Sequence, residues 1–193
     1  MVSAHPFSGN FSPFFCVAAN MDHTKAGPGI WIISLGGVIF ILVLFISAYW
    51  EADIRWLHFF QAWMYLATMG LVWMDNKWGL FVGFGAAAFW NYTTLFVNTF
   101  LKNGLDQALL LVHSGHLSRP DLFISVPAWF GNLLVIVGCC VLYMRRSDRS
   151  WADIPKLLIA FAGTTGFFAL AMALFQPRYL PLFRQCLHPK LHL

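Results

Sequence analysis

One polar segment of the sequence contains histidines and a carboxylate with the spacing of metal ligands. His113 and His116 are three positions apart, and Asp121 follows shortly after them. Positions i and i+3 of a helix share a face, so two imidazoles there can hold one divalent metal ion and a carboxylate can complete the site. This spacing is less specific than an HExxH motif, and the alternative is a pair of interfacial histidines at the level of lipid headgroups. The metal candidates are His113, His116 and Asp121, and the sequence specifies no other cofactor.

A second polar group stands at the start of an uncharged run. Glu51 and Asp53 precede the run, and His58 and Gln61 lie inside it. An ionisable side chain within a membrane segment is unfavourable unless it faces the interior of a bundle. His58 is therefore either a histidine hydrogen-bonded to a neighbouring helix, or a proton carrier or ligand contact. Glu51 and Asp53 either belong to a binding or catalytic group, or pair locally in a solvated loop.

A third group is a polar stripe in an otherwise apolar run. Asn91, Thr94 and Asn98 stand at positions i, i+3 and i+7, so they share one face of a helix. Such a stripe either joins helices through hydrogen bonds or lines a polar cavity. The candidate ligand-binding residues are Glu51, Asp53, His58, Gln61, Asn91, Thr94 and Asn98.

The amino-acid composition indicates what kind of protein contains these polar groups. Only 10% of the 193 residues are charged, and 59% are hydrophobic. Soluble proteins carry about 25% charged residues, and a soluble domain of this size has too little interior to bury so much apolar surface. The composition therefore predicts an integral membrane protein. The net charge of +4 comes from basic residues scattered between apolar runs, which argues against nucleic acid as a partner.

Five uncharged runs supply the expected membrane segments. They span 30–50, 56–74, 78–101, 122–144 and 157–175. About 20 residues of helix cross a hydrocarbon core of about 30 Å. Only helices or closed barrels satisfy the backbone in lipid, and long runs without alternation are typical of helices. We therefore expect an all-α integral membrane bundle of about five transmembrane helices.

The longest connection between these runs, 102–121, is too polar to be a further span. Residues 105–112 have a helical pattern, with Asn103 as a candidate cap. We expect a short interfacial helix here, on the membrane surface between the third and fourth transmembrane helices. Gly79 and Gly83 form a GxxxG motif, which predicts that the third helix packs at the centre of the bundle.

The expected organisation is a loose amino-terminal tail at 1–29, a single five-helix membrane domain at 30–177 and a carboxyl-terminal tail at 178–193. Five spans place the two termini on opposite sides of the membrane. Lys and Arg are shared equally between the two faces, so the positive-inside rule gives a tie. The basic cluster at 145–149 favours a cytoplasmic amino terminus. Translation could start at Met1 or at Met21.

The candidate residues lead to three functional hypotheses. The first is a non-enzymatic protein that binds or passes a small molecule through a cavity open on the face that carries 51–58 and 102–121. The second is a structural subunit of a larger membrane complex. The third is an enzyme at the membrane interface that acts on a lipid-like substrate with a histidine–carboxylate or metal site. The expected partners are the lipid bilayer, a small-molecule or lipid ligand, and other subunits of a complex.

Overall fold

The computed structural model describes residues 27–181, and every regular element in this range is helical. The elements are α1 (Pro28–Trp50), the 3-10 turn η4 (Ala52–Ile54), α2 (Arg55–Trp73), α3 (Lys77–Phe96), α4 (Phe100–Ser114), α5 (Pro120–Phe123), α6 (Ser125–Arg145), α7 (Asp153–Phe175) and the 3-10 turn η5 (Pro177–Tyr179). The two possible start sites and most of the expected tails lie outside the described residues.

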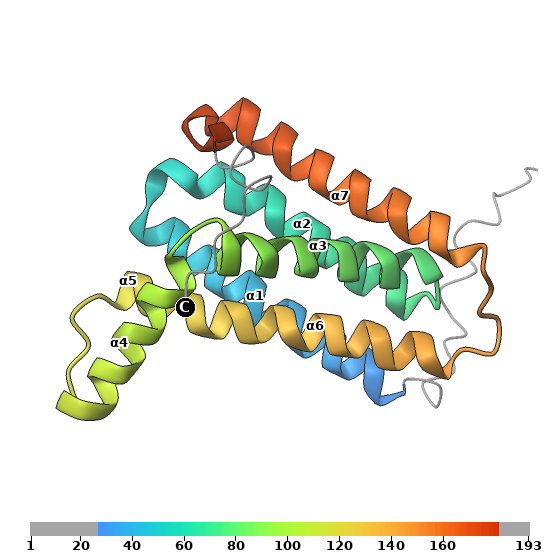
Figure 1. Ribbon diagram of the computed structural model, residues 1–193, viewed down its shortest axis with the longest axis horizontal. Helices are drawn as coiled ribbons and strands as arrows, with labels where there is room; N and C mark the ends of the chain where they lie inside the picture. The colour runs from blue at the N-terminus through green and yellow to red at the C-terminus, as the bar shows by residue number, and fades with distance from the viewer. Residues whose placement is uncertain (1–26, 182–193) are drawn as a thin grey trace, which may run out of the picture.

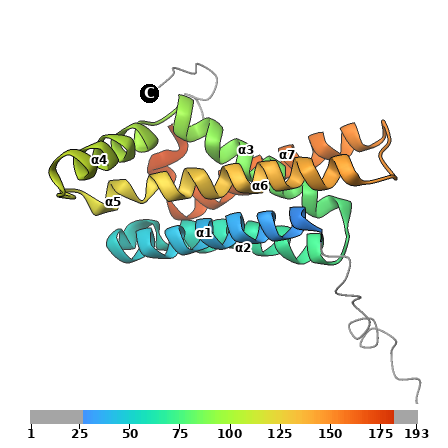
Figure 2. The ribbon, with the colours of Figure 1, turned by 90° about the horizontal axis from the view of Figure 1, so that it is seen from below.

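The five long helices run side by side as an antiparallel bundle (Figure 1). Helix α3 contacts α2, α6 and α7, and α1 packs most extensively against α6. Figure 2 shows α1 and α2 as one layer beneath α6. The third apolar run is thus central to the bundle, as its small residues predicted.

Two glycine contacts show how closely the helices approach. A Cβ atom at Gly36 of α1 would lie 2.5 Å from the Gly131 carbonyl oxygen of α6. A Cβ atom at Gly83 of α3 would lie 2.5 Å from the Thr68 methyl carbon of α2. Both distances are shorter than van der Waals contact, so these crossings require glycine. Close backbone approach at small residues is the usual way in which helices pack in lipid.

Three helical stretches are long and apolar enough to cross a membrane: α1, α5 together with α6, and α7. Helices α3 and α4 meet the same requirement only as a pair, which is bent by 73°, so the number of such stretches is three or four. Helix α2 has 19 residues but is less apolar, because it contains His58 and Gln61. These helices are compatible with a multi-pass membrane protein, although length and composition do not establish the expected number of five spans.

The end of the third run differs from the prediction. The run 78–101 was expected to be one helix, but α3 ends at Phe96 and α4 begins at Phe100. The Asn98 side-chain oxygen accepts the backbone N–H of Phe100 at 2.9 Å, which satisfies an amide that the new helix leaves free. The expected cap, Asn103, therefore lies inside α4 and does not begin it.

Glycine also determines where α4 packs. A Cβ atom at Gly104 would lie 1.9 Å from the Ser125 hydroxyl oxygen, so α4 can rest against the start of α6 only with glycine at this position. From there α4 points away from the bundle, as both views show (Figures 1 and 2).

The bundle has two chemically different ends. The end of α1, the start of α2, the end of α3 and the end of α7 meet at one of them, which we call the cavity end. The connections 74–76 and 146–152 lie at the other, which we call the network end. The alternation of helix direction predicted from the sequence accounts for this grouping.

Candidate functional site

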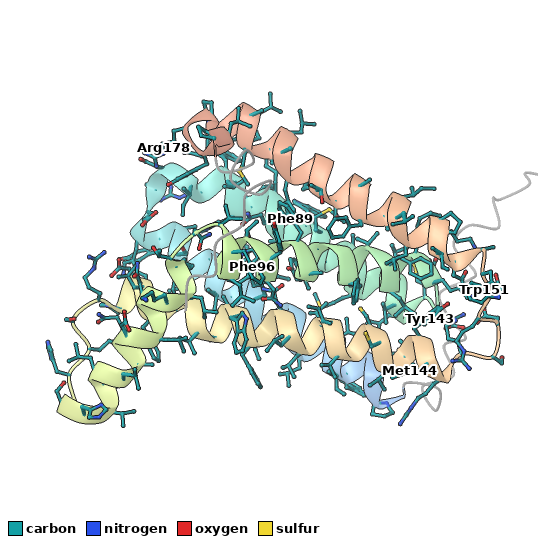
Figure 3. The ribbon with its side chains drawn as sticks, viewed as in Figure 1. Phe89, Phe96, Tyr143, Met144, Trp151 and Arg178 are labelled. Atoms are coloured by element: carbon teal, nitrogen blue, oxygen red, sulfur yellow. The ribbon has the colours of Figure 1, made fainter. Side chains whose placement is uncertain are left out.

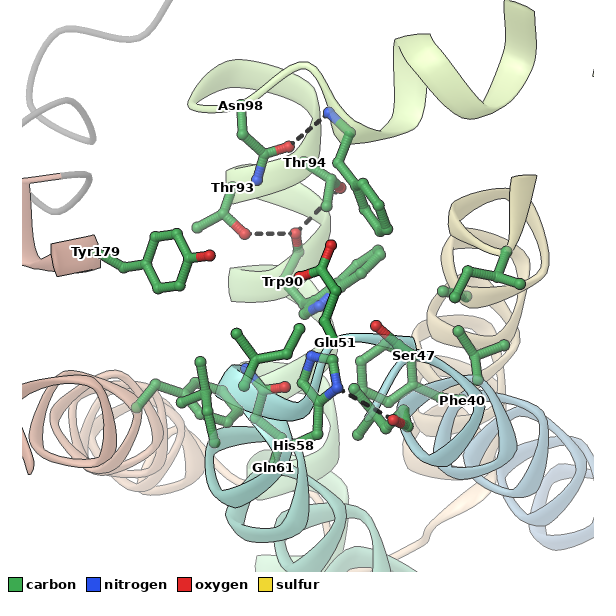
Figure 4. A pocket seen from close by; sticks show the side chains of 18 of the residues that line it. Phe40, Ser47, Glu51, His58, Gln61, Trp90, Thr93, Thr94, Asn98 and Tyr179 are labelled. Carbon is green, nitrogen blue, oxygen red and sulfur yellow. Dashed lines mark hydrogen bonds between the residues drawn. The ribbon is translucent and has the colours of Figure 1, made fainter. Parts of the chain in front are cut away.

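A cavity of about 360 Å³ lies at the cavity end, between α1, α2, α3, the second half of α7 and the segment 121–128 (Figure 4). It brings together six of the ten candidate residues that the sequence singled out. They are Glu51, His58, Gln61, Thr94, Asn98 and Asp121. These residues come from segments that are far apart in the sequence, so the grouping is a product of the fold.

His58 occupies the wall that α2 shares with α1. Its Nδ1 atom lies 3.1 Å from the Leu44 carbonyl oxygen. A carbonyl can only accept, so Nδ1 carries the proton and donates it, and Nε2 of the neutral ring is left as an acceptor. Figure 4 shows the ring pointing toward the Glu51 carboxylate. His58 therefore has the bond to a neighbouring helix that one interpretation expected, and it also faces the cavity.

Gln61 lies one turn further along α2. It is 8% exposed, and its side-chain oxygen has no hydrogen-bond partner among the described residues. Buried polar atoms in native proteins are nearly always paired, so an unpaired one calls for an explanation. Because Gln61 lines the cavity, a ligand or water in that space can reach its amide.

The polar stripe of α3 divides between two environments. Thr94 and Asn98 line the cavity, and the Thr94 hydroxyl donates to the Trp90 carbonyl of its own helix at 3.1 Å. Asn91 does not line the cavity, although it is buried and neither polar atom of its side chain has a partner among the described residues. The shared face of the three residues is therefore not one continuous cavity wall.

The carboxylates at the cavity end have different surroundings. Asp121 lines the cavity and pairs with Arg119 at 2.6 Å, and this hydrogen bond raises the pKa of Arg119. Asp53 is outside the lining and pairs with Arg178 at 3.2 Å. Glu51 makes no ion pair with another described residue. Glu51 is therefore the carboxylate at the cavity whose charge has no direct counter-charge.

The metal candidates are not brought together. Helix α4 ends at Ser114, and Gly115 adopts a left-handed backbone with φ of 65°, so His113 and His116 do not share a helical face. His113 is hydrogen-bonded through Nδ1 to the Leu109 carbonyl at 2.8 Å. Within residues 27–181, no three His, Cys, Asp or Glu side chains form a group that could hold a metal ion.

Aromatic side chains form much of the cavity wall, and the sequence analysis missed them. They are Phe40, Trp50, Phe89, Trp90, Phe100, Phe168 and Tyr179. Figure 4 shows Phe40, Trp90 and Tyr179 around the polar residues, and Figure 3 shows Phe89 between α3 and α7. In an apolar run these residues have the same types as ordinary packing residues, so no sequence signal distinguishes them.

The sequence analysis also missed a set of ion pairs at the network end. The Asp153 side chain is 3% exposed and accepts hydrogen bonds from Lys77 at 3.0 Å and from Lys156 at 3.2 Å. The Tyr143 hydroxyl and the Ser150 backbone N–H also donate to it, at 3.2 and 3.1 Å. Figure 3 places Tyr143 and Trp151 at this end and Arg178 at the other.

Arg146 joins the two connections at the network end. It pairs with Asp75 at 2.6 Å and with Asp148 at 2.9 Å. The hydrogen bond from Arg146 lowers the pKa of Asp148. The three aspartates at this end, Asp75, Asp148 and Asp153, are therefore all held in ion pairs, which is a structural arrangement.

Comparison with other proteins finds no matching protein family, no matching curated protein and no matching solved structure. A function for this chain therefore has to be argued from the geometry of the cavity.

Proposed function

We propose that this protein is a polytopic membrane protein that binds a small molecule in the cavity at the cavity end. The observation that carries the proposal is the convergence of six polar candidate residues on one space of about 360 Å³. Ligand sites have volumes of about 300–1,000 Å³ and are mostly apolar, with a few polar groups that fix orientation. The aromatic walls and the side chains of Glu51, His58 and Gln61 have this composition.

The unpaired oxygen of Gln61 supports the proposal energetically. Leaving a buried acceptor without a partner costs about 1–3 kcal/mol. An apolar residue of similar size would avoid this cost, so the glutamine reduces the stability of the empty protein. A bound molecule that donates a hydrogen bond to Gln61 removes the penalty, which then contributes to its affinity.

The proposal includes a membrane arrangement. Helices α1, α2, α3, α6 and α7 cross the bilayer, and α4 lies on its surface at the mouth of the cavity. Helix α2 is less apolar because its His58 and Gln61 face the cavity and not lipid. Helix α4 bends away from α3 and exposes Leu109 and Val112, the latter to 81%. Apolar side chains on such a helix suit the boundary between headgroups and acyl chains.

A neutral fluorescent probe tests the proposal. The protein, purified in mild detergent, is titrated with N-phenyl-1-naphthylamine, and energy transfer from tryptophan reports binding, since Trp50 and Trp90 line the cavity. The substitution Thr93→Phe fills the space with a ring. The matched control is Val137→Phe, which adds the same ring at a lipid-facing position of α6.

We expect saturable binding to the wild type and to Val137→Phe, and loss of binding in Thr93→Phe. Gel filtration and thermal unfolding check that each variant is folded. A folded Thr93→Phe protein that binds the probe as the wild type does would show that the cavity is not the binding site.

A further inference from the structure

The charges around the cavity are unusual for a basic protein. The chain has 12 Lys and Arg residues and a net charge of +4, yet no Lys or Arg is among the described residues that line the cavity. Glu51 and Asp121 do line it. Arg119 neutralises Asp121 at 2.6 Å, whereas Glu51 has no ion-pair partner among the described residues. Glu51 is therefore the carboxylate of the lining that no described residue holds in an ion pair, and the Arg119 charge acts on it only at longer range.

Three neutral polar side chains of the cavity have already donated their protons to backbone carbonyls. The hydroxyls of Thr93 and Thr94 donate their protons to the Trp90 carbonyl, at 2.8 and 3.1 Å. His58 gives its Nδ1 proton to Leu44, so a neutral ring offers only the Nε2 lone pair. Gln61 adds a side-chain oxygen that is unpaired among the described residues. These acceptor atoms carry partial negative charge, so they favour a ligand that brings a positive group or a hydrogen-bond donor to them.

The indole of Trp90 adds an aromatic face to the cavity that Glu51 also lines. Its ring packs edge-to-face against Phe40, with 5.1 Å between centroids, so its position is fixed before a ligand arrives. Trp90 and Glu51 both line the cavity, and Figure 4 labels both of them. Trp is the side chain that attracts cations most strongly through its ring, and the attraction is larger where water is excluded.

We infer that the cavity takes an organic cation: a molecule with an apolar body and a protonated amine or quaternary ammonium group, held with its positive group beside Glu51 and Trp90. The inference rests on the proposed function, because it names the class of ligand for the same cavity. An anion in this place would face the Glu51 carboxylate, and no described Lys or Arg lines the cavity to offset the repulsion. A neutral hydrocarbon would leave the Glu51 charge and the Gln61 oxygen without a partner.

Two probes of equal shape test the charge requirement. Phenyltrimethylammonium and tert-butylbenzene differ by one positive charge, because a nitrogen in the first replaces a carbon in the second. Each is titrated against wild-type protein loaded with N-phenyl-1-naphthylamine, and the concentration that displaces half of the probe is recorded. The measured quantity is the ratio of the two concentrations, which cancels effects that both compounds share.

The test variant is Glu51→Gln, and the matched control is Asp53→Asn. Both remove one negative charge from the same connection, but Asp53 pairs with Arg178 and is outside the cavity lining. We expect the wild type and Asp53→Asn to prefer the ammonium compound by about tenfold or more, and Glu51→Gln to lose most of that preference. Gel filtration checks that Glu51→Gln is folded.

The outcomes separate this inference from the proposed function. Equal displacement by both compounds in the wild type overturns the inference and leaves small-molecule binding in place. A preference that survives in Glu51→Gln, or that Asp53→Asn loses equally, also overturns it. The proposed function and the inference are overturned together if the neutral probe does not bind the wild type, or if it binds folded Thr93→Phe as well as it binds the wild type.

Discussion

The two ends of the bundle contain the same tripeptide in opposite surroundings. Ala52–Ile54 and Ala152–Ile154 both read Ala-Asp-Ile, and each lies at the start of a helix, at the cavity end and the network end respectively. The Asp53 side chain is 69% exposed and has one ion pair. Asp153 is almost fully buried and accepts hydrogen bonds from two lysines, a tyrosine and a backbone amide.

The comparison extends to the groups around each aspartate. At the network end, donors and acceptors satisfy one another, so their contribution is to stability. At the cavity end, the buried Gln61 oxygen has no partner among the described residues, which lowers stability. Glu51 is exposed and has no ion pair with another described residue, so its carboxylate is also left for a ligand. The same kinds of residue serve the fold at one end and, in our proposal, a binding site at the other.

The largest effect is expected from Asp153→Ala. The substitution leaves Lys77 and Tyr143 without their shared acceptor in a mostly buried place, and breaking a buried ion pair is strongly destabilising. We expect the midpoint of thermal unfolding in mild detergent to fall by several degrees. In the matched variant Asp53→Ala it should hardly change, because exposed ion pairs contribute little. Equal midpoints for the two variants would contradict the comparison.

A second pair of variants tests the cost of an unpaired buried polar atom inside the bundle. The Tyr65 hydroxyl donates to the side-chain oxygen of Asn132, and both residues are fully buried. Tyr65→Phe leaves that oxygen unpaired, so the free energy of unfolding should fall by about 1–3 kcal/mol. Thr68, one turn along the same helix, has an unpaired buried hydroxyl. Thr68→Val should leave stability unchanged or raise it, as a denaturant titration in detergent can measure.

Gln61→Leu should separate stability from binding. Removing an unpaired buried oxygen is expected to raise the free energy of unfolding by about 1 kcal/mol. The same change should weaken binding of phenyltrimethylammonium, because it removes the partial negative charge of the Gln61 oxygen from the cavity wall. A variant that is less stable and binds as tightly as the wild type would refute the assignment of Gln61 to the site.

The smallest effect concerns pH at the network end. Arg146 holds the pKa of Asp148 below its ordinary value of 3.8, so the carboxylate contributes stability above that value and loses it as pH falls through the lowered pKa. Wild-type protein should therefore be slightly more stable than Asp148→Asn at neutral pH. The difference should begin to shrink below about pH 4 and vanish once the pH is below the lowered pKa of Asp148. Thermal unfolding of both proteins from pH 7 to pH 3 measures it.

Much of the fold follows from the sequence. Uncharged runs at 30–50 and 157–175 correspond closely to α1 and α7, because long apolar segments satisfy their backbone only as helices. Alternating helix direction then brings Glu51, His58 and Asn98 to one end. These residues were detectable because polar groups at the edge of, or within, an apolar run stand out from their neighbours.

The rest depends on contacts that local sequence does not encode. The break at 97–99 lies inside an uncharged run, and it depends on a hydrogen bond from Phe100 to the Asn98 side chain and on contact between Gly104 and Ser125. The pairing of His113 with His116 failed because Gly115 ends the helix between them. Identical tripeptides around Asp53 and Asp153 also show that residue type alone does not specify burial.

In the proposed membrane arrangement, the bend between α3 and α4 connects the membrane surface to the cavity. Asn98 and Phe100 line the cavity, and the hydrogen bond between them also starts α4. A change in the angle between α3 and α4 therefore also changes the shape of the cavity. A lipid or protein that changes the orientation of α4 would therefore also move residues that line the cavity. By thermodynamic reciprocity, a ligand whose affinity depends on that angle biases how α4 lies on the membrane.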